Sequence, residues 1–381
     1  MRIDMSLSIP MPLHVIVDDV GWWSGRDGSS FNQPYRTGMT RDHLPADYLA
    51  LTALGEMLGM KILTGFVLCE WDRTNLLREL PSSTWMGADW DNSGTSREKR
   101  EVAAGIIAGA PDYIEIALHG IGHEYWANGR MERAEFHDQA CRMRDPGEIR
   151  KHLEYFLRLM EQQGFSPRPE VFIPPAMKHS FGNGDQGVQK LLNEYGIRYV
   201  TTMFEETRWL SAPLHPGVTW ENGVILVDRG RHGLKWNDTG CDPVFTFDRP
   251  LLTLHWTNLL CRDPNENRVM VKKWADFIRS GAKAHGLLLS RNIKSCLTQY
   301  LHRRFSKIVF DGSDYTIDLS WTTELPGSLL DDTLFIRHAG PPETAFVMSG
   351  ATMHCPAKER ESSLMAITPE AGAKKIRLRP L

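Results

Sequence analysis

Five polar side chains follow three apolar, strand-like runs of this chain, and their types can bind a metal ion or transfer protons. They are Asp18 and Asp19 after the first run, His119 and His123 after the second, and His255 at the end of the third. Buried parallel strands read as such apolar, β-branched runs. Because α/β folds place their chemistry at the carboxyl ends of strands, the pattern points to a functional site.

The spacing of the two histidines suits a metal ion. Three residues separate His119 from His123, so one helical turn or a tight glycine-containing loop can point both imidazoles at one ion. Imidazole and carboxylate together suit zinc and other borderline divalent metals. The plainer alternatives are an incidental histidine pair and two solvated aspartates at a strand end. Three strand ends with such residues are hard to explain by packing alone.

The order and approximate spacing of these motifs resemble the polysaccharide deacetylase (NodB-homology) superfamily, which includes carbohydrate esterase family four. Asp18 and Asp19 are similar to its first motif, an aspartate pair after a strand. The segment from His119 to His123 resembles its metal-binding motif, and residues 252–255 resemble the motif of its catalytic histidine. The resemblance extends over roughly residues 13–290.

This resemblance implies a fold and a reaction. The fold is α/β, a distorted (β/α) barrel of the NodB-homology type, and the reaction is hydrolytic removal of an N-acetyl group from an amino sugar or acetylated saccharide. Asp19, His119 and His123 would hold one divalent metal ion, with zinc expected and cobalt or nickel as alternatives. Asp18 would be the general base and His255 the general acid.

The chain departs from the family pattern at two motifs. Ile173 stands where the family usually carries an arginine that pairs with the catalytic aspartate. The candidate replacements are Arg168, Lys178, Arg229 and Arg231. The fourth motif, an Asp and Trp that support the acid histidine, has only residues 228–229 and 236–238 as candidates. Two alternatives therefore stay open: a related C–N hydrolase acting on a small non-sugar amide, and a non-catalytic carbohydrate-binding protein.

The order of helical and strand-like segments in the sequence predicts two domains. Helical and strand-like segments alternate up to about residue 290, which is typical of parallel βα units. Beyond Ser306 only strand-like segments and turn clusters follow, which predicts an antiparallel, sandwich-like β module. We therefore expect a deacetylase-like barrel over residues 1–290 and a β module over residues 306–381.

Composition limits the partners and the compartment. A formal net charge of -3 gives no basis for binding nucleic acid or a membrane surface. No apolar run approaches the roughly 20 residues of a membrane span, and the first ten residues lack the apolar core of a signal peptide. The six scattered cysteines favour reduced thiols in a cytoplasmic enzyme. We expect a carbohydrate or small acetylated substrate, and self-association into a homo-oligomer stays open.

Overall fold

The computed structural model describes residues 6–325, 329–340, 344–358 and 362–381. The chain forms two compact units. The larger unit comprises Val15–Thr246 and Leu251–Ser280, and the smaller unit comprises Met1–His14, Phe247–Pro250 and Gly281–Leu381. The smaller unit therefore combines segments that are far apart in the sequence.

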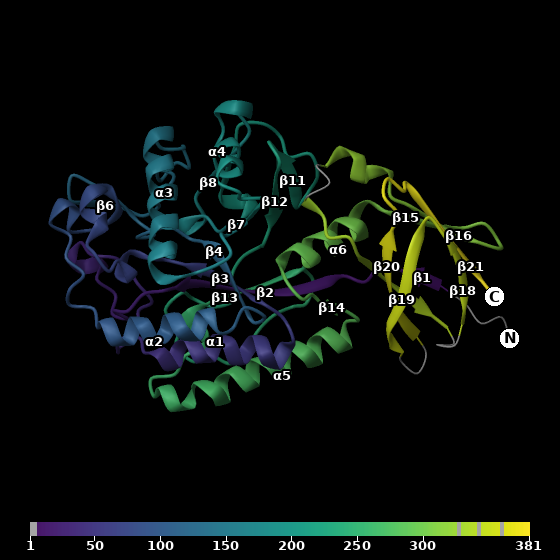
Figure 1. Cartoon of the computed structure of the whole chain (residues 1–381), viewed down its shortest axis with the longest axis horizontal. Helices are drawn as coiled ribbons and strands as arrows, with labels where there is room; N and C mark the ends of the chain where they lie inside the picture. The colour runs from purple at the N-terminus through teal and green to yellow at the C-terminus, as the bar shows by residue number, and fades with distance from the viewer. Residues whose placement is uncertain (1–5, 326–328, 341–343, 359–361) are drawn as a thin grey trace. The chain divides into compact units, whose positions relative to one another are not determined.

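One large sheet positions the strand ends of the larger unit (Figure 1). Its strand order is β11-β12-β9-β7-β4-β3-β2-β13. In that order the strands are Val218–Glu221, Val224–Asp228, Tyr199–Thr202, Val171–Phe172, Ile114–Leu118, Ile62–Phe66, Pro12–Val20 and Leu251–His255. The pairs from β12 to β2 are parallel, and β11 is antiparallel to β12. The carboxyl ends of the parallel strands therefore meet along one edge.

The predicted fold class is confirmed. The eight strands curl into a half-barrel in a mixed α/β arrangement, with β11 and β13 at its two ends. All nine residues of β2 are buried, as expected for a parallel strand that is covered on both faces. The carboxylates of this strand are therefore held in the interior of the fold.

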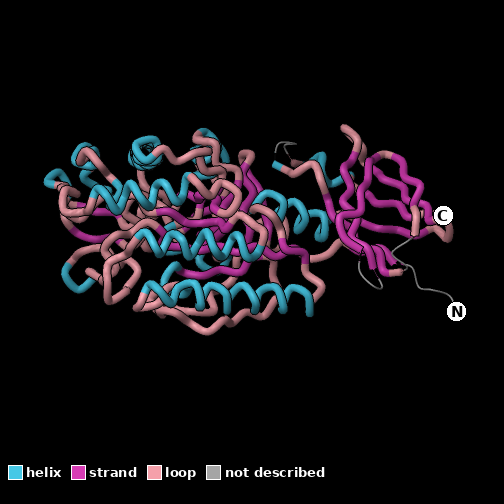
Figure 2. The backbone as a smooth tube through the Cα atoms, turned by 60° about the horizontal axis from the view of Figure 1, so that its bottom comes forward, coloured by secondary structure: helices cyan, strands magenta, loops and turns pink. Residues whose placement is uncertain are grey.

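Helices alternate with these strands along the chain, as Figure 2 shows in cyan and magenta. They are α1 (Pro45–Leu58), α2 (Arg97–Ala108), α3 (Pro146–Gln163), α4 (Val188–Glu194) and α5 (Asn267–Ala284). α3 begins where the Asp145 side chain accepts the N–H groups of Gly147 and Glu148, and it ends at Gly164, whose φ is 72°. An N-cap carboxylate and a left-handed glycine are ordinary helix boundaries, so local sequence sets these limits.

The smaller unit holds two antiparallel sheets and helix α6 (Ile293–Phe305). One sheet has the order β1-β17-β20-β19, formed by Ser6–Ser8, Leu334–Ala339, Ser362–Pro369 and Ala351–Lys358. The other has the order β15-β16-β21-β18, formed by Lys307–Phe310, Tyr315–Asp318, Lys375–Pro380 and Phe346–Ser349. Buried side chains such as Ile317, Ile336 and Leu378 form its core. In the structure, β1 from the N-terminal part of the chain pairs with β17 in one of these sheets. That residues 306–381 fold independently as a β module stays a prediction.

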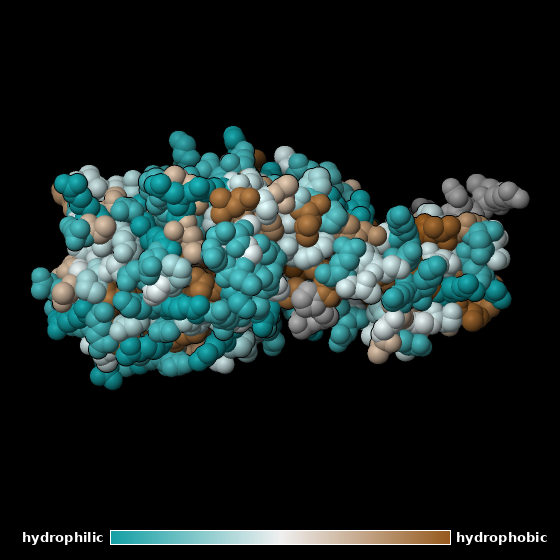
Figure 3. Space-filling view, turned by 90° about the horizontal axis from the view of Figure 1, so that it is seen from above, coloured by the Kyte–Doolittle hydropathy of each residue, from teal (hydrophilic) through white to brown (hydrophobic). Residues whose placement is uncertain are grey.

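The described helices include none that is both long and apolar enough to cross a membrane. On the face drawn in Figure 3, hydrophobic side chains appear as small patches separated by hydrophilic ones. This agrees with the 24% of charged residues in the sequence.

Three buried histidines should make the protein less stable in mild acid. Burial lowers the pKa of His14 and of His302 to about 4, and that of His137 to about 3, from an ordinary value of 6.5. The unfolded chain binds these protons at a higher pH than the folded protein does. The contribution of these histidines to the free energy of unfolding is therefore fully present above the pKa that they have in the unfolded chain. It is lost as the pH falls toward the lower pKa that they have in the folded protein. At about 1.4 kcal/mol per pKa unit, each histidine contributes on the order of 3 kcal/mol.

Denaturant unfolding of the metal-free protein at several pH values between about 4 and 7 checks this. His302→Gln should flatten the decline in the free energy of unfolding, because the folded protein no longer excludes a proton there. His354→Gln, which changes an exposed side chain, is the matched control. An equal decline in the parent and in His302→Gln would contradict the prediction.

Candidate active site

The fold brings all five predicted side chains to one cavity of about 420 Å³ in the larger unit. Asp18 and Asp19 lie on β2, His119 follows β4 directly, and His255 is the last residue of β13. The cavity is also lined by Arg133, Ala176, Met177, His232, Leu234, Lys235 and Trp236. The sequence prediction that these strand ends meet in space therefore agrees with the structure.

The carboxylate of Asp19 lies between the two histidines of the metal-like motif. Its Oδ1 is 3.4 Å from Nε2 of His119 and 3.7 Å from Nε2 of His123. In a tetrahedral zinc site with ligand bonds of about 2.0–2.1 Å, the ligand atoms are roughly 3.4 Å apart. The spacing and the chemistry of these donor atoms therefore fit one divalent metal ion.

The imidazole of His119 is held in the tautomer that a metal ligand needs. Its Nδ1–H donates to the backbone carbonyl of Ile173 at 2.7 Å, which leaves the lone pair on Nε2 facing Asp19. Ile173, which stands where the resemblance led us to expect arginine, contributes its main-chain carbonyl to the site.

His123 has a carboxylate behind it. Glu124 Oε1 lies 3.3 Å from Nδ1 of His123 and accepts a hydrogen bond of 2.6 Å from Arg133. Arg133 also lies 2.7 Å from this Nδ1. Nε2 of His123 accepts the backbone N–H of Ala176 at 3.2 Å, a bond that a metal on Nε2 would replace. Ligation through Nε2 also requires a proton on Nδ1, so a bound metal would keep the contact with Glu124 and exclude the hydrogen bond from Arg133. Burial, followed by Arg133, lowers the pKa of His123 and favours the neutral imidazole.

The loop that presents the two histidines is fixed by Glu135, which the sequence did not single out. Its buried carboxylate accepts the N–H groups of Ile121 at 3.0 Å and of Gly122 at 3.1 Å. Gly120 has a φ of 103°, and an added Cβ there would lie 2.3 Å from Glu135 Oε2. Only glycine fits that approach, so the loop between the histidines has little freedom.

Asp18 is paired with a cation from another strand. Its Oδ2 accepts a hydrogen bond of 2.8 Å from Arg229, which follows β12, and the two side chains are 1% and 0% exposed. Among the described residues its Oδ1 has no hydrogen-bond partner. Burial disfavours the charged form of Asp18, but Arg229 and nearby histidines outweigh it and lower its pKa. Asp18 is therefore an ionised carboxylate that lines the cavity, with one oxygen bound by Arg229 and the other buried without a hydrogen-bond partner among the described residues.

Arg229 is thus the cation beside Asp18, a position that the sequence left open among four candidates. The other three form ion pairs elsewhere: Arg168 with Glu161, Lys178 with Glu206, and Arg231 with Glu205.

His255 lies against a second histidine that sequence reasoning missed. Its ring stacks on that of His232, with centroids 4.3 Å apart and an interplanar angle of 29°. Nε2 of His232 is 3.6 Å from Asp18 Oδ2. Burial lowers the pKa of both imidazoles, although Asp19 and Asp18 act in the opposite direction on His255. The signal available in the sequence was the position of His232 just after a strand.

The carboxylates proposed for the fourth motif serve other contacts. Asp228 accepts N–H groups from Phe204 and Gly230, and Asp238 accepts the N–H of Lys235. These bonds shape the loop that carries His232.

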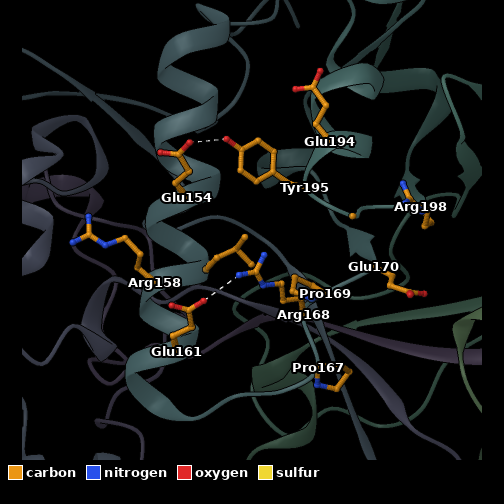
Figure 4. A pocket seen from close by; sticks show the side chains of 12 residues that line it. Glu154, Arg158, Glu161, Pro167, Arg168, Pro169, Glu170, Glu194, Tyr195 and Arg198 are labelled. Carbon is orange, nitrogen blue, oxygen red and sulfur yellow. Dashed lines mark hydrogen bonds and ion pairs between the residues drawn. The ribbon is translucent and has the colours of Figure 1, made fainter.

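A larger cavity, of about 860 Å³, lies beside α3 and contains none of the five side chains predicted for the metal and acid–base roles (Figure 4). Several of its charged and polar side chains bind one another. Tyr195 donates to Glu154 at 2.8 Å, and Arg168 donates to Glu161 at 3.1 Å. Size alone therefore does not identify the site, and the chemistry of the side chains favours the smaller cavity.

Removing Arg229 should strongly destabilise the fold. Arg229→Met leaves the Asp18 charge buried without its partner, and such changes cost roughly 3–5 kcal/mol of unfolding free energy. Arg231→Met is the matched control, because it breaks an exposed ion pair and should cost much less. Denaturant unfolding of both variants measures the difference, and equal losses would contradict a role for Arg229 in compensating a buried charge.

Comparison with known proteins gives few matches. No protein-family model and no curated protein matches the chain. Among solved structures, a putative polysaccharide deacetylase from Mycobacterium smegmatis has 14% identity and a TM-score of 0.39, covering 74% of this chain and 93% of that one. A family 4 carbohydrate esterase from Streptomyces lividans, in complex with acetate, has 10% identity and a TM-score of 0.34, covering 76% and 95%.

An endogalactoceramidase structure has 8% identity and a TM-score of 0.26, covering 98% of this chain and 96% of that one. All three TM-scores lie below 0.5, so the activities of these proteins are not transferred to this chain. The structures to which the chain is similar nevertheless include a polysaccharide deacetylase and a family 4 carbohydrate esterase, the two groups that its motifs resemble.

Proposed function

We propose that this protein is a metal-dependent hydrolase that removes an N-acetyl group from an amino sugar or an acetylated saccharide. One observation carries the proposal: a single cavity combines a three-residue ligand set with a buried carboxylate and an imidazole outside that set. Asp19, His119 and His123 would hold the ion. A divalent metal there polarises an acyl carbonyl and makes a nearby water more acidic.

Asp18 is suited to take a proton from the attacking water. Arg229 holds its Oδ2, while Oδ1 has no protein partner in the described part of the chain. The guanidinium keeps the carboxylate ionised at neutral pH and fixes its orientation. Asp18 can therefore accept a proton at Oδ1 without moving, which is what a general base requires.

His255 is suited to give a proton to the departing nitrogen. It lies on the opposite side of the sheet path from His119, because β13 and β4 flank β3 and β2. His255 and the proposed ligands line the same cavity, so a group bound there can contact both. Water adds its oxygen to the acyl carbon and gives one proton to Asp18, and the C–N bond then breaks as His255 gives a proton to the nitrogen. The products are the free amine and acetic acid, and transfer of the proton from Asp18 to His255 restores the enzyme.

An aromatic side chain in the same cavity supports a sugar substrate. Trp236 is half-buried, lines the cavity, and meets Tyr35 edge-on at 5.8 Å between ring centroids. Indole faces offer apolar area with a polar edge, which suits the face of a pyranose ring. Lys235 is exposed beside it and adds a hydrogen-bond donor.

Two measurements test the proposal in order. Metal analysis of the purified protein should find about one zinc, cobalt or nickel ion per chain. A panel of N-acetylated amino sugars, acetylated oligosaccharides and small non-sugar amides is then screened for release of acetate or amine. Failure to bind any divalent metal would overturn the proposal, and turnover of non-sugar amides alone would overturn the saccharide assignment.

A further inference from the structure

The backbone of His255 is firmly held, but its ring is not hydrogen-bonded to any described carboxylate. The N–H of His255 donates to Asn258 Oδ1 at 2.8 Å. The next residue, Trp256, is fully buried and stacks on His43 with centroids 4.2 Å apart. Nδ1 of His255, by contrast, is buried and has no hydrogen-bond partner within the described residues. The orientation of the ring must therefore come from packing.

His232 is the side chain that packs on this ring. The near-parallel stack, 4.3 Å between centroids, brings the loop after β12 against the end of β13. The side chain of His232 is only 14% exposed, and its own Nδ1 is likewise buried without a described partner. The contact is therefore between two desolvated rings, where offset stacking adds to burial.

A second metal ion is the competing explanation for this pair. Asp18, His232 and His255 each offer a ligand atom, and these atoms lie within 4.8 Å of one another. However, the guanidinium of Arg229 already binds Asp18 at 2.8 Å, deep in the interior. A divalent ion there would stand beside a buried arginine and next to the Asp19 ligand set, so charge repulsion opposes it.

We propose that His232 is a positioning residue whose ring, stacked on His255, sets the orientation of the acid histidine. The inference rests on the proposed function for the role of His255, but the stack itself does not. The His255 ring is then oriented by packing against the imidazole of His232 and not by a hydrogen bond to a carboxylate. This packing assigns a role to His232, for which the sequence motifs gave none.

The test uses the full-length protein loaded with zinc and three variants. His232→Ala removes the stacking ring, His232→Phe keeps a flat ring without nitrogen atoms, and Arg231→Gln is the control in the same loop. Zinc content, the crystallographic conformation of His255, and kcat and KM on an acetate-releasing substrate are measured. Melting temperatures show whether each variant is folded.

We expect the parent and all variants to bind one zinc ion per chain. The His255 ring should rotate or occupy several conformations in His232→Ala and keep its orientation in His232→Phe. With substrate, His232→Ala should lower kcat by between about tenfold and 100-fold with little change in KM, the scale of a misplaced catalytic group. His232→Phe should recover most of this loss, and Arg231→Gln should match the parent.

Three results would overturn the inference. Loss of a second zinc equivalent in His232→Ala would make His232 a ligand. An unchanged His255 ring in that variant would show that other packing suffices. A His232→Phe enzyme as slow as His232→Ala would mean that the imidazole acts directly. If no compound releases acetate, the proposed function fails, but zinc content and the His255 conformation still decide the inference.

Discussion

Replacing His119 with alanine should abolish tight binding of a divalent metal ion. The variant loses one of the three proposed protein ligands, the imidazole whose tautomer is fixed by its hydrogen bond to the Ile173 carbonyl. Because even residues that only orient ligands change metal affinity by about 10–100-fold, loss of a ligand should cost more than about 100-fold. Metal content after dialysis and competition with a chromogenic chelator measure this change.

His354→Ala is the control for this experiment, because it removes an exposed histidine of the smaller unit. It should bind metal as the parent does. A normal metal stoichiometry and affinity in His119→Ala would show that Asp19, His119 and His123 are not the ligand set, whatever activity the protein has.

Replacing Asp18 with asparagine or His255 with alanine should leave the metal bound and nearly stop the reaction. Neither side chain is needed as a ligand, yet each faces the cavity beside the ligand set. Loss of a general base or acid typically lowers kcat by about 100-fold or more. Metal analysis and steady-state kinetics on a substrate found in the screen measure the two effects separately.

The pH dependence distinguishes the two roles. The parent should show a bell-shaped profile, with an acidic limb from Asp18 and a basic limb from His255. Because burial lowers the pKa of His255, its acid form is lost, and the rate falls, as the pH rises through that lowered pKa. The basic limb should disappear in His255→Ala.

Asp112→Asn, a change at an exposed carboxylate, is the control for both variants. Parent-like rates in Asp18→Asn and His255→Ala, with metal still bound, would show that the catalytic roles are wrong even if the metal site is right.

The parts of this structure that were predictable are those set by local sequence. The apolar spacing and the initial proline of residues 45–58 are local signals that predict a helix, and the structure has helix α1 at Pro45–Leu58. The buried strand that delivers Asp18 and Asp19 was likewise visible as a continuous apolar run. The five predicted site residues lie at the ends of such strands. Because parallel strands end at one edge of a sheet, the sequence also predicted that these side chains meet in one place.

The supporting residues could not be predicted, because their partners are chosen by tertiary structure. Asp18 and Arg229 are 211 positions apart in the chain, and the residues next to either one do not predict that the two side chains pair. Glu135 binds backbone N–H groups in the loop between His119 and His123. Almost every residue has such a group, so the sequence gives no signal for this contact. His232 meets His255 only because their two loops reach the same cavity.

The separation of Asp18 from Arg229 also has a consequence for how the site is assembled during synthesis. The three proposed ligand residues lie on β2 or in the loop after β4, whereas the counter-ion of Asp18 follows β12 and His255 ends β13. In a chain synthesised from its N-terminus, the proposed metal ligands therefore leave the ribosome before the guanidinium partner of Asp18 and before His255. We expect the proposed ligand set to be complete before the groups proposed for acid–base catalysis are in place.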